Sequence, residues 1–161
     1  NPAFWPGDGA VYYAMLRHLD AKRILEVGSG HSTRLAARAA QLNGAELTCI
    51  EPYPMPSLKT DLPGLSRLVE QPVQAVPFAE FERLQAGDVL FFDSTHVSKI
   101  GSDVNHLFLR VVPRLAPGVV VHVHDIFLPW EMPRAWVLEK KIFWIVAWIE
   151  SSSIPEDSYL Y

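Results

Sequence analysis

The chain alternates short apolar runs with stretches whose apolar residues recur every three or four positions, which is typical of a parallel sheet with helices between its strands. We expect strands over residues 23–27, 46–51, 66–70, 88–93 and 119–125. We expect helices over residues 9–19, 32–42, 78–84 and from about 102 to 113. Asp8 is placed to cap the first helix. The predicted fold is α/β: a Rossmann-like, doubly wound, mostly parallel sheet with helices on both faces.

Length and charge exclude several classes of protein. The 161 residues fit a single domain, 1–161. With 14 basic and 18 acidic residues, the chain is not expected to bind nucleic acid. Its longest apolar run, residues 142–149, is too short to cross a bilayer, and we expect neither a signal peptide nor a membrane partner. The single cysteine, Cys49, is expected to be a reduced core residue, which favours a cytoplasmic protein.

The segment Glu26-Val27-Gly28-Ser29-Gly30-His31-Ser32-Thr33 carries the strongest chemical signal. Glycines between a strand and a helix let the backbone approach a ligand closely, and the helix start offers free N–H groups. A dinucleotide site favours a third glycine, where this chain has Thr33. A buried acid such as Glu26 beside the turn suits a ligand with an ammonium group. A plain tight turn is the alternative interpretation.

Glu51 narrows the choice of ligand. It ends the second expected strand, 21 residues after Gly30, where a carboxylate can accept hydrogen bonds from both hydroxyls of a ribose. An acid at a strand end is unremarkable alone. Together with the glycine turn it indicates a nucleoside site, and the missing third glycine argues against two phosphates.

These motifs occur in one order: Glu26-x-Gly28-x-Gly30, then Glu51, then the strand 88–93. In this the chain resembles the class I S-adenosylmethionine-dependent methyltransferases over about residues 8–130. The resemblance implies S-adenosylmethionine as the cofactor, with the first acid and the glycine turn at its methionine end and Glu51 on its ribose. The cofactor-binding candidates are Glu26, Gly28, Ser29, Gly30, Glu51 and Asp93.

Two further clusters, Asp93-Ser94-Thr95-His96 and His124-Asp125, are similar to those of a bacterial small-molecule O-methyltransferase subfamily, methyltransferase domain family 24. Neighbouring parallel strands end at the same edge of a sheet, so we expect the clusters to converge. Asp93, His124 and Asp125 are candidate ligands of a divalent cation, Mg²⁺ or Mn²⁺, and an imidazole fits Mn²⁺ better. In a metal-free alternative, His96 or His124 is the catalytic base. A third alternative is purely structural, as expected for His122, a hydrogen-bonded core residue.

The resemblance therefore implies an S-adenosylmethionine-dependent methyltransferase that methylates a hydroxyl of a small-molecule acceptor. The alternative is a catalytically degenerate domain that binds the cofactor or a partner protein. A nicotinamide-dependent oxidoreductase is disfavoured by Thr33. Nothing in the sequence identifies the acceptor.

The segment after Asp125 departs from the fold of this family. We expect one helix over residues 133–150 and one strand near 158–161, so the sheet is expected to lack the full C-terminal antiparallel strand pair. Residues 142–149 are apolar on every side, and such a helix is either buried or shared with a partner. A homodimer through this aromatic segment is the resulting hypothesis.

Overall fold

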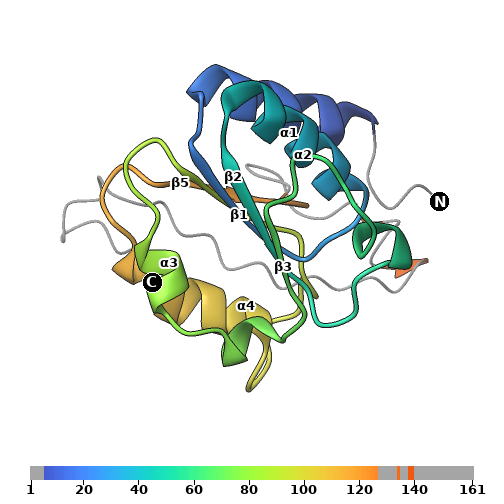
Figure 1. The fold of residues 1–161 in the computed structure, drawn as a ribbon. Coiled ribbons are helices and arrows are strands. Elements are labelled where there is room, and N and C mark those ends of the chain that lie inside the picture. Colours follow the sequence, from blue (N-terminus) through green and yellow to red (C-terminus); the bar gives the residue numbers. More distant parts are fainter. Residues whose placement is uncertain (1–5, 127–133, 135–137, 140–161) are drawn as a thin grey trace.

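The computed structural model describes residues 6–126, 134, 138 and 139 (Figure 1). The strands are β1 (Arg23–Val27), β2 (Glu46–Ile50), β3 (Arg67–Val69), β4 (Val89–Phe92) and β5 (Val120–Val123). All pairings are parallel, and the strand order is β3-β2-β1-β4-β5. Each predicted strand is confirmed to within two residues at its ends. Apart from residues 134, 138 and 139, the expected helix over 133–150 lies outside the described part of the chain, as do the expected strand near 158–161 and the apolar segment on which the dimer hypothesis rests.

The helices lie on both faces of the sheet. They are α1 (Pro6–Leu19), α2 (His31–Asn43), α3 (Ala79–Glu82) and α4 (Asp103–His106). Short 3₁₀ turns, η1 (Pro56–Leu58) and η2 (Val73–Ala75), flank β3. Figure 1 shows α1 and α2 on one side of the strands and α3 and α4 on the other, so the predicted doubly wound architecture is confirmed. None of the described helices has the length and apolarity needed to cross a membrane.

Two predicted helices differ from the structure. The first begins at Pro6 instead of Gly9, because proline suits the first helical turn, where no N–H partner is needed. Asp8 therefore lies within that turn and is not the cap. The helix predicted from about residue 102 to 113 is α-helical only over α4, and it continues as a π-helical turn, Leu107–Val111, and a 3₁₀ turn, Val112–Arg114. Pro113 has no N–H to donate, so the α-helical hydrogen-bond pattern is interrupted at that residue.

The apolar strands divide their side chains between two cores. On the side of α1 and α2 the strands contribute Ile24, Leu47, Cys49, Val89 and Phe91. On the other side they contribute Leu25, Val27, Ile50, Leu90 and Phe92. Burial on both faces explains why the central strands are almost continuously apolar. Cys49 is free and buried, as predicted.

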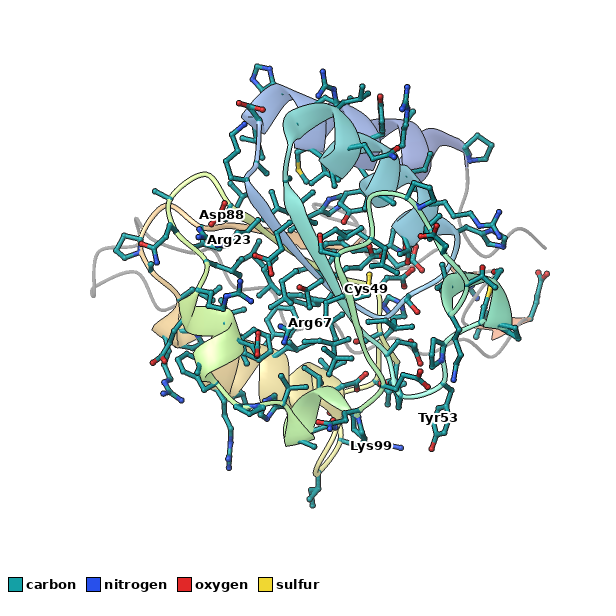
Figure 2. The ribbon with its side chains drawn as sticks, viewed as in Figure 1. Arg23, Cys49, Tyr53, Arg67, Asp88 and Lys99 are labelled. Atoms are coloured by element: carbon teal, nitrogen blue, oxygen red, sulfur yellow. The ribbon has the colours of Figure 1, made fainter. Side chains whose placement is uncertain are left out.

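The order of the strands creates a crevice at one edge of the sheet. The chain moves from β1 outward through β2 to β3, then returns to the other side of β1 for β4 and β5. Ligands of such folds bind at the carboxyl ends of the strands where this change of direction occurs, here between β1 and β4. At the opposite edge, buried Asp88 accepts hydrogen bonds from the backbone N–H groups of Arg23 and Gln85. Figure 2 shows Arg23 and Asp88 together at that end, far from Tyr53 in the loop after β2.

Candidate active site

The glycine turn after β1 lies directly against the end of β4. Gly28 has a φ of +85°, and a Cβ atom there would lie 1.9 Å from the carbonyl oxygen of Asp93. The Gly28 N–H donates to the Ile50 carbonyl at 3.0 Å, and the Asp93 N–H donates to the Val27 carbonyl at 3.0 Å. Both the backbone conformation and the close approach require glycine at this position.

The second glycine has a different environment. Gly30 is the N-cap of α2, has an extended φ of 177°, and a Cβ atom there would meet no heavy atom of the structure within 4 Å. Its N–H donates to the Thr33 hydroxyl at 2.9 Å. Thr33 therefore closes the turn from within, at the position where a dinucleotide site favours a third glycine. The glycine turn borders open space on the side of Gly30.

Glu26 supports the glycine turn from inside the protein. Its side chain is fully buried, and one carboxylate oxygen accepts hydrogen bonds from the hydroxyls of Ser32 at 2.5 Å and Thr33 at 3.1 Å. Burial raises the pKa of Glu26 from 4.5 to about 7, although the two hydroxyls oppose this change. The carboxyl group is thus directed toward the first turn of α2. Direct contact between Glu26 and a bound ammonium group stays a prediction.

Glu51 comes one residue after β2, and its carboxylate reaches the glycine turn. One oxygen accepts the N–H of Ser29 at 3.2 Å, and the other accepts the N–H of Tyr53 at 2.8 Å. Glu51 therefore lies beside the turn, and its contact with a ribose stays a prediction. The Ser29 hydroxyl is buried and has no hydrogen-bond partner among the described residues.

Beyond the ends of β4 and β5, Asp93, His96 and His124 form a compact cluster. Each offers one ligand atom, and these three atoms all lie within 4.8 Å of one another. The His96 Nε2 atom is 2.8 Å from Asp93 Oδ1, and the His124 Nδ1 atom is 3.4 Å from the same oxygen. The predicted convergence of the two sequence clusters is confirmed. His96 has a φ of +57°, a left-handed conformation that is uncommon for a residue with a side chain.

Two more carboxylates flank His124. Asp125 Oδ1 lies 3.6 Å from His124 Nδ1, and Asp8 Oδ2 lies 3.6 Å from His124 Nε2. The sequence suggested Asp93, His124 and Asp125 as ligands of a cation. In the structure the compact cluster instead contains His96 together with Asp93 and His124. His122, two residues earlier, packs edge-on against Phe91 and Tyr12 but is half-buried, and its buried Nδ1 has no hydrogen-bond partner in the described structure, unlike the hydrogen-bonded core residue that was expected.

The charges of the cluster stabilise one another. Burial raises the pKa of Asp93, but the imidazoles of His124 and His96 outweigh burial and hold that pKa well below its ordinary value. Burial lowers the pKa of His124, but Asp93, Asp125 and Asp8 together raise it above its ordinary value. The cluster combines an ionised carboxylate with two imidazoles, a set that can move a proton or bind a cation.

Comparison with known proteins places these residues in a family. A family described as a methyltransferase domain matches residues 25–126, which include the glycine turn, Glu51 and both histidine-containing clusters. The chain belongs to this methyltransferase family. An uncharacterized protein of Archaeoglobus fulgidus is 33% identical over 90 residues, which are 53% of this chain and 41% of that relative. The match thus covers less than half of the relative's length.

Two residues of the methyltransferase domain acquire a place in the site only from the structure. Asp8 precedes the family match, and its local sequence indicates only a residue near a helix start. Because α1 leads into the amino end of β1, its first turn lies over the carboxyl edge, beside His124. Thr33 departs from the dinucleotide pattern, and no sequence signal indicated its bonds to Gly30 and Glu26.

The two glycines of the methyltransferase domain should respond differently to the same substitution. We expect Gly28→Ala to lower the free energy of unfolding by about 3 kcal/mol or more, because the added Cβ strains the backbone and overlaps Asp93. We expect Gly30→Ala to change it by no more than about 1 kcal/mol. Urea denaturation of both variants measures the difference. Equal losses in the two variants would contradict the structure of this turn.

Glu26 should make stability depend on pH. The folded protein binds the Glu26 proton more tightly than the unfolded chain, so this stabilisation is complete below pH 4.5 and is lost as the pH rises through about 7. Relative to Glu26→Gln, the wild type should lose roughly 3 kcal/mol of unfolding free energy between pH 4 and 8. Denaturant titrations across this range measure it, and parallel profiles for the two proteins would refute it. The titratable groups facing Glu26 are Tyr12, Cys49 and Asp93, and all three are present in both proteins.

Proposed function

We propose that the domain transfers a methyl group from S-adenosylmethionine to a hydroxyl group of a small molecule. One observation carries the proposal: the glycine turn with Glu51, and the Asp93–His96–His124 cluster, lie at the carboxyl ends of adjacent strands. The first group suits a nucleoside with an amino-acid portion, and the second suits activation of a hydroxyl. An enzyme that methylates a hydroxyl has to hold the methyl donor and the acceptor side by side, so the donor-binding and hydroxyl-activating residues are needed at one place.

The residues of the glycine turn fit the donor molecule. Gly30 borders open space, and the Ser29 hydroxyl is a buried group without a hydrogen-bond partner among the described residues. Glu51 would accept the ribose hydroxyls, and Gly28 to Gly30 would hold the amino-acid portion. When bound, S-adenosylmethionine supplies a methyl group on a positively charged sulfur. Asp93 is the further candidate for contact with it.

The acceptor hydroxyl has to lose its proton as its oxygen is methylated. The oxygen–methyl bond forms while the sulfur–methyl bond breaks, giving a methyl ether and S-adenosylhomocysteine, and the hydroxyl proton passes to a base. His96 and His124 are the candidate bases. Asp93 contacts a ring nitrogen of each, so its carboxylate would stabilise the imidazolium that forms and orient the ring.

A divalent cation also fits this cluster. Asp93, His96 and His124 would hold it through one carboxylate oxygen and two imidazole nitrogens, and Asp125 lies beside them. This donor set favours Mn²⁺ or another transition metal over Mg²⁺, which prefers oxygen ligands. Such an ion would supply positive charge beside the acceptor oxygen.

Binding of the reaction product tests the proposed function directly. We expect S-adenosylhomocysteine to bind with micromolar affinity in a calorimetric titration, and Glu51→Ala to weaken binding about tenfold or more, since two hydrogen bonds to a charged group are lost. Glu82→Ala removes an exposed acid from α3 and should leave the affinity unchanged. NAD should not bind. A folded protein that fails to bind S-adenosylhomocysteine would favour the degenerate, partner-binding alternative.

Titration with Mn²⁺ tests the cation site. The electron paramagnetic resonance signal of unbound Mn²⁺ falls as the ion binds, and we expect it to give one bound ion per chain. His96→Ala or Asp93→Asn should weaken Mn²⁺ binding at least about tenfold, because each substitution removes one ligand. Asp61→Asn, at an exposed position, is the control and should bind like the wild type. If the wild type binds no Mn²⁺ or Mg²⁺ yet transfers methyl groups, the metal-free mechanism with a histidine base is the correct one.

A further inference from the structure

A second feature of the site is a pocket of about 250 Å³ on the α1 side of the sheet. Asp8 and Val11 of α1 form one wall, and residues 122–126, at the end of β5, form the other. His124 belongs both to this pocket and to the cluster with Asp93 and His96. A molecule in the pocket would therefore lie beside the groups proposed to activate the acceptor.

The described lining of this pocket is acidic. Asp8 and Asp125 contribute carboxylates, and neither lysine nor arginine occurs among the described lining residues. Asp93 adds a third carboxylate on the other edge of the His124 ring. The three carboxylates together carry three negative charges. A bound divalent cation would neutralise two of them and, with neutral imidazoles, leave one net negative charge. The pocket is thus unfavourable for an anion with or without a bound metal.

Asp8 is the carboxylate best placed to meet a ligand. Its side chain is 43% exposed and forms a 3.6 Å ion pair with His124 Nε2. That distance exceeds a normal hydrogen bond, so both carboxylate oxygens retain acceptor capacity. Val11, in the same wall of the pocket, offers apolar contact for a carbon skeleton.

We propose that Asp8 selects the acceptor, a small hydroxyl compound that also carries an ammonium group, with the chemistry of an amino sugar. The ammonium group donates to the Asp8 carboxylate while a hydroxyl lies beside His124. Acceptors bearing a carboxylate or a phosphate are rejected by Asp8 and Asp125. This inference rests on the proposed function, because it assigns the substrate class of the same site.

Three hexoses of one ring size and different charge test the selection: glucosamine, glucose and glucuronate. Their affinities are measured by calorimetry or ligand-observed NMR with the full chain saturated with S-adenosylhomocysteine and Mn²⁺. We expect glucosamine to bind about tenfold more tightly than glucose, and glucuronate to bind most weakly. Asp8→Asn should remove most of the preference for glucosamine and change glucose binding little. Asp8→Lys should reverse the order of glucosamine and glucuronate.

The controls separate this inference from the proposed function. Asp20→Asn, just after the other end of α1, should keep the wild-type preference, and each variant should bind S-adenosylhomocysteine like the wild type. Failure of S-adenosylhomocysteine to bind would overturn the proposed function itself. If it binds, equal affinity for the three hexoses, binding of none of them, or a glucosamine preference that survives Asp8→Asn would each overturn the role of Asp8.

Discussion

The close contact between Gly28 and the carbonyl group of Asp93 is the constraint on which the site depends. It brings the turn after β1 against the residue that follows β4, at the point where the winding of the sheet changes direction. A side chain at position 28 would separate these segments. The cofactor-binding candidates and the proton-transferring candidates would then no longer share one crevice, because the first group follows β1 and β2 and the second follows β4 and β5.

Polar groups behind this contact hold the loops in place. Glu26 of β1 is buried against the first turn of α2, and its hydrogen bonds from Ser32 and Thr33 continue through Thr33 to the N–H of Gly30. A buried carboxylate without partners is strongly destabilising, and these hydroxyls reduce that cost. Glu26 thus connects the conformation of the glycine turn to the first turn of α2. These linked hydrogen bonds support the turn whether or not Glu26 itself contacts a ligand.

The Asp93–His96–His124 cluster is arranged differently, since it lies at the surface of the crevice and its charges compensate one another. His124 has carboxylates on both edges of its ring, Asp93 and Asp125 near Nδ1 and Asp8 near Nε2. His96 and Asp125 both adopt left-handed backbone conformations, with φ values of +57° and +59°. Such conformations persist where the surrounding structure requires them, and they are common where side chains must be directed into a site.

The sequence by itself determined the α/β class, the parallel strands and the residues at the carboxyl edge. Apolar runs such as 88–93 require burial on two faces, and the spacing from Gly28 to Glu51 follows from one strand–helix–strand unit. Only the tertiary structure decided that Asp8 faces His124, that Thr33 closes the glycine turn, and that His96 takes the place of Asp125 in the compact donor cluster. The contact between Asp8 and His124 joins segments far apart in the chain. The contacts that Thr33 and His96 make depend on local backbone angles. Neither kind of contact leaves a periodic pattern in the sequence. Local propensity governs the elements, whereas the packing of α1 and β5 against the central strands governs which side chains meet.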